Sequence, residues 1–275
     1  MKKRFNWLKQ IPLYILLSLG GVVMVIPFVY MVSTALKGQV YIFEFPPRFI
    51  PQEPTLANFV EAWQSNNFQL YFTNSLVVAI FTTLFSVLFS AMLAYAFARF
   101  DFPGKDPAFY LILFTLMIPG PILIIPQFLL AKALGLRNSL QGLVFVYTAM
   151  SIPLNTFLLR GFFEQLPREL EEAVLIDGGG YGTIFFRIVL PLSTPALATV
   201  GIFTFLFSWD EFVWALTAID EPSKRTLPVA IATFHGAHLT QWGLVFAASL
   251  IAMAPVVIVF VALQRYFVRG LTAGA

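Results

Sequence analysis

The segment Leu166–Pro191, LPRELEEAVLIDGGGYGTIFFRIVLP, is a polar interruption in a chain that is otherwise apolar enough to lie in a lipid bilayer. Pro167 stands where the first turn of a helix tolerates proline, and the glutamates that follow it suit the positive end of a helix dipole. A glycine run at 178–180 then ends the helix, because glycine adopts left-handed backbone conformations that bulkier residues resist. The segment therefore predicts a short amphipathic helix, a sharp turn and a return into apolar sequence.

The composition around this segment excludes a soluble globular protein. Hydrophobic residues make up 59% of the chain and charged residues 11%, and the mean hydropathy is +0.81. Soluble domains carry about a quarter charged residues. The absence of cysteine excludes disulfides and iron–sulfur clusters, and no basic run with interleaved aromatic residues indicates nucleic acid as a partner. We therefore expect an all-α protein whose partners include membrane lipid.

Six apolar runs are long enough to cross a bilayer, which requires about 20 helical residues. They lie at residues 13–36, 75–98, 108–131, 139–159, 190–218 and 242–264. The first run is too long for the apolar region of a signal peptide, so we expect it to be an uncleaved span. Between the first two runs, residues 56–63 predict a short amphipathic helix. We expect one transmembrane domain over 1–275, with a loop at about 164–190.

Basic residues between these runs indicate the orientation of the chain. If the N-terminus is cytoplasmic, about eleven of the 17 Lys and Arg residues fall on the cytoplasmic side and about six on the other. Cytoplasmic loops are enriched in Lys and Arg, so the bias supports this orientation. Both termini and the loop at 164–190 are therefore predicted to be cytoplasmic.

The same loop carries a recognisable motif. Glu172-Ala-Val174, Gly178, Ile188 and Leu190-Pro191 stand at the spacing of the EAA motif of bacterial ABC-importer permeases, which they resemble, with valine in place of the second alanine. Further blocks resemble the carbohydrate-uptake branch of that family, in particular its MalG-type subunits; they are Ala94–Gly104, Phe157–Phe163 and Gln264–Ala275. The resemblance covers most of the chain from the second apolar run onward.

The resemblance implies an all-α permease of the bacterial inner (plasma) membrane with the six-helix MetI-like fold. It implies three partners, namely a MalF-like second permease subunit, an ABC ATPase dimer and an extracytoplasmic sugar-binding protein. The cargo would be a sugar or oligosaccharide, moved by alternating access without covalent chemistry. The chain would be neither an enzyme nor a cofactor carrier, and it has no phosphate-binding Gly-Lys-Ser/Thr sequence. The residues that the motif assigns to ATPase docking are Glu172, Ala173, Asp177 and Gly178. The C-terminal block stops early, which leaves its contact with the ATPase open.

A second group of residues is a candidate for the cargo pathway. Asp210 and Glu211 are the acids closest to the membrane interior, where a charge costs about 2.5–3.5 kcal/mol and therefore faces water or a partner. Carboxylates accept hydrogen bonds from sugar hydroxyls, and the indole of Trp209 can stack on a sugar ring. Asn155 and Gln127 are polar side chains within the spans. One alternative is interfacial anchoring, with Trp209 and Trp214 in the aromatic belt and the two acids in headgroup water. For the amides, the alternative is interhelical hydrogen bonding.

Two further features of the sequence are weaker indications of function than these two groups of residues. Residues 119–121, Pro-Gly-Pro, indicate either a kinked gate or a tolerated bend in the third run. His235 and His238 stand three residues apart, but no third ligand accompanies them, so no metal site is predicted.

Three other functions compete with sugar import. The same machine can carry glycerol phosphate or a polyol. An ion-coupled secondary transporter would need charged residues in mid-span, where the runs are almost free of them. A membrane-bound enzyme would need a nucleophile–base pair or a metal constellation, and the sequence offers neither.

Overall fold

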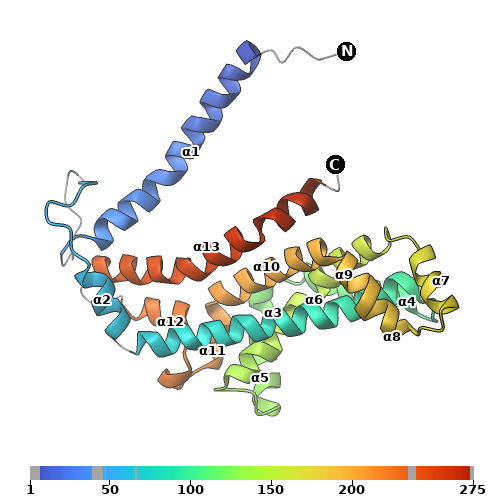
Figure 1. Cartoon of the computed structure of the whole chain (residues 1–275). Coiled ribbons are helices and arrows are strands. Elements are labelled where there is room, and N and C mark those ends of the chain that lie inside the picture. The colour runs from blue at the N-terminus through green and yellow to red at the C-terminus, as the bar shows by residue number, and fades with distance from the viewer. Residues whose placement is uncertain (1–6, 39–45, 47, 66, 235–239, 273–275) are drawn as a thin grey trace. The chain divides into compact units, whose positions relative to one another are not determined.

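The computed structural model describes residues 7–38, 46, 48–65, 67–234 and 240–272, and they form helices with no strand among them (Figure 1). The α-helices are α1 (Trp7–Ala35), α2 (Ala57–Gln64), α3 (Phe68–Arg99), α4 (Lys105–Phe114), α5 (Gly120–Ala133), α6 (Leu140–Phe163), α7 (Glu169–Ile176), α8 (Tyr181–Ile184), α9 (Leu190–Leu192), α10 (Thr194–Asp210), α11 (Val213–Ala218), α12 (Leu227–Ala232) and α13 (Trp242–Thr272). Two 3₁₀ turns, η1 (Thr115–Met117) and η3 (Pro222–Lys224), and a π-helical segment, η2 (Phe185–Val189), complete the elements. The predicted all-α class is confirmed.

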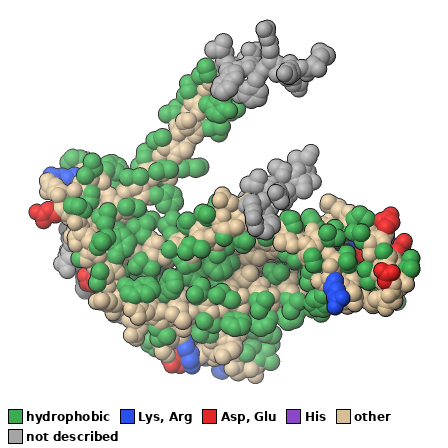
Figure 2. All heavy atoms as spheres, in the orientation of Figure 1, with side chains coloured by type: hydrophobic (Ala, Val, Ile, Leu, Met, Phe, Trp, Pro, Cys, Tyr) green, Lys and Arg blue, Asp and Glu red, His purple; other side chains and the backbone are tan. Residues whose placement is uncertain are grey.

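Four helices are long and apolar enough to cross a membrane by themselves: α1 within residues 11–35, α3, α6, and α13 within residues 242–264. Two bent pairs pass the same test when their parts are counted together, which gives up to six candidate spans. Their side chains leave a largely apolar surface (Figure 2). The orientation of the termini stays a prediction.

The first bent pair differs from the continuous run predicted at 108–131. The helix over residues 105–117 and α5 meet at 108°. Proline cannot donate a backbone hydrogen bond and disfavours helical backbone in the residue before it. Ile118 and Pro119 accordingly take extended conformations, and α5 begins with Gly120-Pro121. The Pro-Gly-Pro sequence therefore divides the run, which is a larger effect than a tolerated bend.

The second bent pair lies where one run was predicted at 190–218. Residues 181–192 and α10 meet at 78°, with the fully buried Ser193 at the corner. Helix α10 ends at Asp210, because Glu211 takes an extended conformation before α11 begins. The apolar run is thus divided at both of these places, which hydropathy alone does not reveal.

The chain folds as two compact units, residues 1–68 with 231–253 and residues 69–230 with 254–275. In the first unit, the Asn58 side chain of α2 is buried and donates a hydrogen bond to the carbonyl of Ala35, at the end of α1, over 2.9 Å. Asn58 also packs on Gly243 so closely that a Cβ there would lie 2.7 Å from its Nδ2. Glycine is therefore required at this approach. The expectation of a single domain over 1–275 stays a prediction.

The second unit is built around α3, α6 and α10. One buried cluster joins the C-terminal halves of α3 and α6 to the segment after α7, through Tyr95, Leu159, Phe163 and Phe185 among others. A second buried cluster joins the other end of α6 to α11 and α12. The first cluster supports the loop that carries the sequence motif, and that loop forms one end of this unit.

Candidate functional site

Helix α7 is the short amphipathic helix predicted from the segment at 166–191. It begins at Glu169, directly after Pro167 and Arg168, and its first turn holds Glu169, Glu171 and Glu172. Acidic side chains in a first turn interact favourably with the helix dipole and with unpaired backbone N–H groups. Figure 2 shows acidic side chains gathered at the end of the unit where α7 lies.

The turn after α7 is a Schellman motif. Gly178 has φ of 80°, its N–H donates to the carbonyl of Leu175 over 3.1 Å, and the N–H of Gly179 donates to the carbonyl of Val174 over 2.8 Å. This pair of bonds closes the last turn of a helix and requires a left-handed residue. Gly179 is constrained as well, since a Cβ there would lie 2.5 Å from Cγ1 of Val174. The two glycines therefore fix the direction in which the chain leaves α7.

The two faces of α7 differ in their exposure. Glu171 and Val174 are partly buried against the rest of the second unit, whereas the side chains of Leu170 and Ile176 are 41% and 86% exposed. The four residues predicted to dock an ATPase are all exposed and lie along α7 and its turn; they are Glu172, Ala173, Asp177 and Gly178. The structure therefore brings the predicted docking residues together on one solvent-facing surface, which we call the α7 surface.

An ion pair attaches α7 to the end of α3. Nε of Arg99 lies 2.5 Å from Oε1 of Glu171, and the two side chains are 6% and 13% exposed. Nη2 of Arg99 also donates to the carbonyl of Leu166 over 2.8 Å, and the hydroxyl of Tyr95 donates to Oε2 of Glu171 over 3.4 Å. Sequence reasoning missed these contacts. The sequence signal that could have predicted them is a single arginine, Arg99, at the end of a long apolar run, together with a glutamate, Glu171, on the apolar face of an amphipathic helix.

Aromatic contacts hold the segment after the turn in the same corner. The ring of Tyr181, at the start of α8, lies 5.0 Å from Phe100, and the ring of Phe185 lies 5.3 Å from Tyr95. Tyr95 and Phe100 contact each other at 5.5 Å. The two pairs of Phe100 are edge-to-face and the Tyr95–Phe185 pair is tilted, and aromatic pairs at such distances are favourable. Both arms of the loop are therefore anchored to the C-terminal end of α3.

The predicted cargo residues on α10 do not form one group. The indole of Trp209 is 2% exposed, stacked on Phe205 at 5.7 Å and edge-on to Phe72 at 5.6 Å. Asp210 is exposed at the end of α10. Trp209 is therefore already covered by aromatic neighbours within the chain, while the adjacent Asp210 is exposed on the surface of the chain.

Glu211 caps α11 rather than extending toward solvent. Its Oε1 accepts the N–H of Trp214 over 2.8 Å, and its Oε2 accepts the N–H of Ala215 over 3.0 Å. The hydroxyl of Tyr147, on α6, also donates to Oε2. A carboxylate that accepts unpaired N–H groups stabilises a helix start. Glu211 therefore fixes the break between α10 and α11 and ties it to α6.

Asn155 is 2% exposed and joins three helices. Its Nδ2 donates to Oγ of Ser86 on α3 over 2.9 Å and to Oγ1 of Thr204 on α10 over 2.8 Å. Of the two roles that the sequence leaves open, the structure shows the interhelical hydrogen bonds. A role for Asn155 in the cargo pathway stays a prediction.

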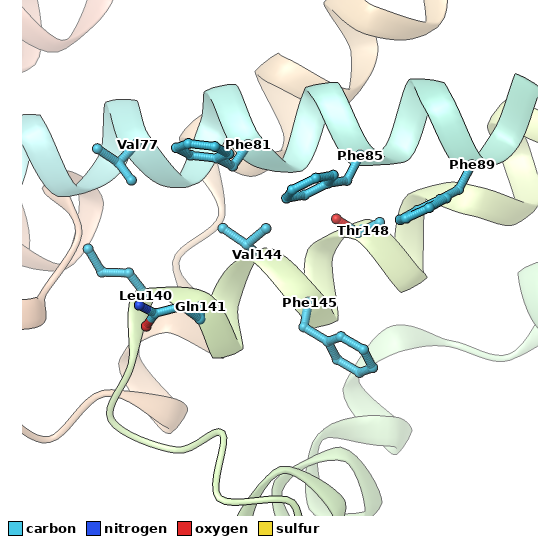
Figure 3. A pocket seen from close by; sticks show the side chains of 9 residues that line it. All are labelled: Val77, Phe81, Phe85, Phe89, Leu140, Gln141, Val144, Phe145 and Thr148. Carbon is cyan, nitrogen blue, oxygen red and sulfur yellow. The ribbon is translucent and has the colours of Figure 1, made fainter.

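The described residues of the second unit form hollows, of which two concern the candidate sites. The larger, about 670 Å³, is a groove between α3 and α6 (Figure 3). Its lining is Val77, Phe81, Phe85, Phe89, Leu140, Gln141, Val144, Phe145 and Thr148. The phenylalanines recur every fourth residue along α3, so their rings line one face of the groove. Sugar binding requires hydrogen-bonding partners for many hydroxyls, and this lining offers few.

The smaller hollow, about 440 Å³, lies where the first bent pair meets α6. Gln127 and Thr115 line it among apolar side chains. Gln127, within the bent pair, therefore lies beside this hollow.

No group of three or more potential metal ligands occurs in the part of the chain that the structure describes. His235 and His238 lie outside the described residues.

Comparison with known proteins identifies the family of this chain. Residues 86–273 match the family model described as "Binding-protein-dependent transport system inner membrane component". The chain is 36% identical to the trehalose/maltose transport system permease protein MalG of Thermococcus litoralis, over 95% of this chain and 96% of that protein. It is 34% identical to the melibiose/raffinose/stachyose import permease protein MelC of Bacillus subtilis, over 91% and 90%.

Two more matches extend the comparison. The sulfoquinovosyl glycerol transport system permease protein SmoH of Agrobacterium fabrum is 37% identical, over 90% of this chain and 87% of that protein. A chain in the crystal structure of a bacterial ABC transporter that imports the acidic polysaccharide alginate superposes with a TM-score of 0.84 and 22% identity, covering 97% of this chain and 99% of that one. The structural match shows the same fold.

Proposed function

The chain belongs to the family of binding-protein-dependent transport system inner membrane components, and we propose that it is the transmembrane subunit of an ATP-driven importer for a sugar or oligosaccharide. We base the proposed cargo class on the similarity of nearly the whole chain to permeases named for maltose, trehalose and raffinose-type sugars. A second candidate cargo is a glycoside of glycerol, which the 37% identity to the sulfoquinovosyl glycerol permease favours.

The α7 surface is the proposed docking site for an ATPase that is a separate polypeptide. A docking element must be exposed and must keep its shape under load, since a flexible loop would absorb the movement of its partner. The exposed apolar side chains Leu170 and Ile176 and the exposed Glu172 supply the contact surface. The Schellman turn and the anchors on α3 supply the rigidity.

The remaining partners follow from the family. Its description as binding-protein-dependent supports an extracytoplasmic sugar-binding protein, which would deliver cargo to the side opposite α7. A MalF-like permease subunit would complete the transmembrane pathway, and two ATPase copies would dock beneath. With the loop at 164–190 facing the ATPase, both termini are cytoplasmic and the protein lies in the bacterial inner membrane.

Asp210 is the residue that we assign first to the cargo pathway. Its carboxylate is exposed at the end of α10, beside the break that leads to α11. Trp209, Glu211 and Asn155 have neighbours inside the chain and would shape the pathway through packing. These assignments rest on the proposed cargo.

The test is reconstitution of this chain with the products of its neighbouring genes in liposomes. ATP hydrolysis is measured with a panel of binding proteins, each loaded with one sugar, polyol or glycerol derivative. We expect one sugar-loaded binding protein to stimulate both hydrolysis and uptake. Uptake driven by an ion gradient without ATP would instead establish a secondary transporter.

A further inference from the structure

We propose that Arg99 and Glu171 form an ionic joint through which α7 and α3 move as one body, so that displacement of α7 by the ATPase is passed to α3. This inference rests on the proposed docking of α7. It assigns a positioning role to two residues, one on the docking helix and one on a candidate membrane span. Neither residue belongs to the α7 surface itself.

The contacts of Arg99 hold α7 at two points. Its Nε pairs with Glu171 inside the helix, and its Nη2 binds the carbonyl of Leu166 in the segment that leads into the helix. The planar guanidinium carries its charge and several donors in a fixed arrangement, so one side chain makes an ion pair with Glu171 and a hydrogen bond to Leu166 at once. Rotation or translation of α7 relative to α3 therefore breaks at least one of these contacts.

Burial makes this pair different from the other ion pairs among the described residues. In the joint, the side chains are 6% and 13% exposed, whereas Asp101 in its pair with Lys105 is 93% exposed and Asp220 in its pair with Arg137 is 65% exposed. Exposed pairs exchange readily with water and are screened by salt. A buried charge that loses its partner is strongly unfavourable. Relative movement of α7 and α3 would separate this buried pair, so the joint stays closed and the two helices move together.

Side-chain packing around the joint further restricts movement of α7 relative to α3. Tyr95 reaches Glu171 through its hydroxyl, and its ring contacts both Phe100 and Phe185. The segment before α7 and the segment after its turn therefore meet on the same end of α3. Both segments that flank α7 are anchored to α3, so neither can absorb a displacement of the α7 surface by changing its own conformation.

The joint faces away from the docking residues, so it can be altered without changing them. Glu171 is partly buried, whereas the adjacent Glu172 and Ala173 are exposed. Variants at Arg99 and Glu171 can therefore impair the transmission of movement from α7 to α3 while they leave the docking of the ATPase unchanged.

The first experiment uses the complete complex in liposomes with Arg99→Gln, Glu171→Gln and the double variant. Lys105→Gln, which removes the exposed pair with Asp101, is the matched control. Two quantities are measured, the amount of ATPase that copurifies with the chain and the cargo imported per ATP hydrolysed. We expect unchanged copurification and a fall of about tenfold in cargo per ATP, within the usual range of coupling between sites. The double variant should lose no more than either single variant, because both remove one joint.

The second experiment measures the movement directly. The chain has no cysteine, so Leu175→Cys, at an exposed position of α7 that is not one of the docking residues, and Met92→Cys on the exposed side of α3 give a pair of spin-label sites. The distance between the labels should stay constant between the nucleotide-free and ATP-bound complexes with the joint intact, and it should change between these states in Glu171→Gln. If the glutamine variants do not fold, Arg99→Lys replaces them, because lysine keeps the charge but cannot bind both Glu171 and the carbonyl of Leu166. In this variant the distance between the labels should also change between the two states, by a smaller amount.

The outcomes are distinguishable. Failure of the ATPase to copurify with the unaltered chain would overturn the proposed docking itself. Normal copurification with normal cargo per ATP in the glutamine variants, or a label distance that changes while the joint is intact, would overturn the joint and leave the docking standing.

Discussion

Replacing Gly178 by proline tests whether the turn after α7 carries the coupling. Proline fixes φ near −65°, whereas Gly178 has φ of 80°. The substitution also removes the N–H that donates to the carbonyl of Leu175. The Schellman turn cannot form with proline at this position, so the chain must leave α7 in another direction.

The magnitude follows from the backbone. A non-glycine residue in the left-handed conformation costs about 1–2 kcal/mol, so Gly178→Ala should lower the population of the native turn about 5–30-fold relative to alternatives. Proline adds the lost hydrogen bond and an inaccessible φ, and its cost is about 3 kcal/mol or more. The candidate membrane spans are untouched, so insertion into the membrane should be unchanged. Uptake should fall in the order wild type, alanine, proline.

The assay compares membrane-inserted protein, ATP hydrolysis and uptake for each variant. Gly180→Ala is the matched control, because Gly180 has φ of −102° and no atom lies within 4 Å of an added Cβ. We expect the control to behave as wild type and Gly178→Pro to hydrolyse ATP without corresponding uptake. Normal uptake by Gly178→Pro, or an equal loss in Gly180→Ala, would refute the role of the turn.

Three further predictions concern single residues. Asn155→Leu removes two interhelical hydrogen bonds and should lower stability by about 1–2 kcal/mol in detergent unfolding, whereas Leu154→Ala at an exposed position should lower it less. Glu211→Ala removes the cap of α11 and should lower the free energy of unfolding by about 0.5–2 kcal/mol. Asp210→Ala should change the free energy of unfolding by no more than about 0.5 kcal/mol and should reduce uptake. An equal loss of stability in both variants would contradict the different roles of these neighbours. Glu172→Lys should leave folding unchanged and reduce copurifying ATPase about tenfold, and undiminished copurification would exclude Glu172 from the interface.

The site was only partly predictable from the sequence. The sequence predicted α7 and its glycine turn, because these depend on local backbone rules, while the docking role of the four exposed residues stays a prediction from the motif. It did not identify Arg99 as their anchor, since that contact joins residues far apart in the chain. It also grouped Trp209, Asp210 and Glu211, which the structure separates because consecutive residues at a helix end point in different directions.

The sequence by itself determined the membrane class, the apolar helices and the family, since composition, run length and motif spacing are properties of the linear chain. Only the tertiary structure decided where two of those runs bend, by 108° and 78°, and which polar side chains became buried hydrogen-bond partners. The physical reason is that hydropathy measures the preference of a segment for lipid. The bends and the ion pair between α3 and α7 depend instead on which groups other helices bring within reach.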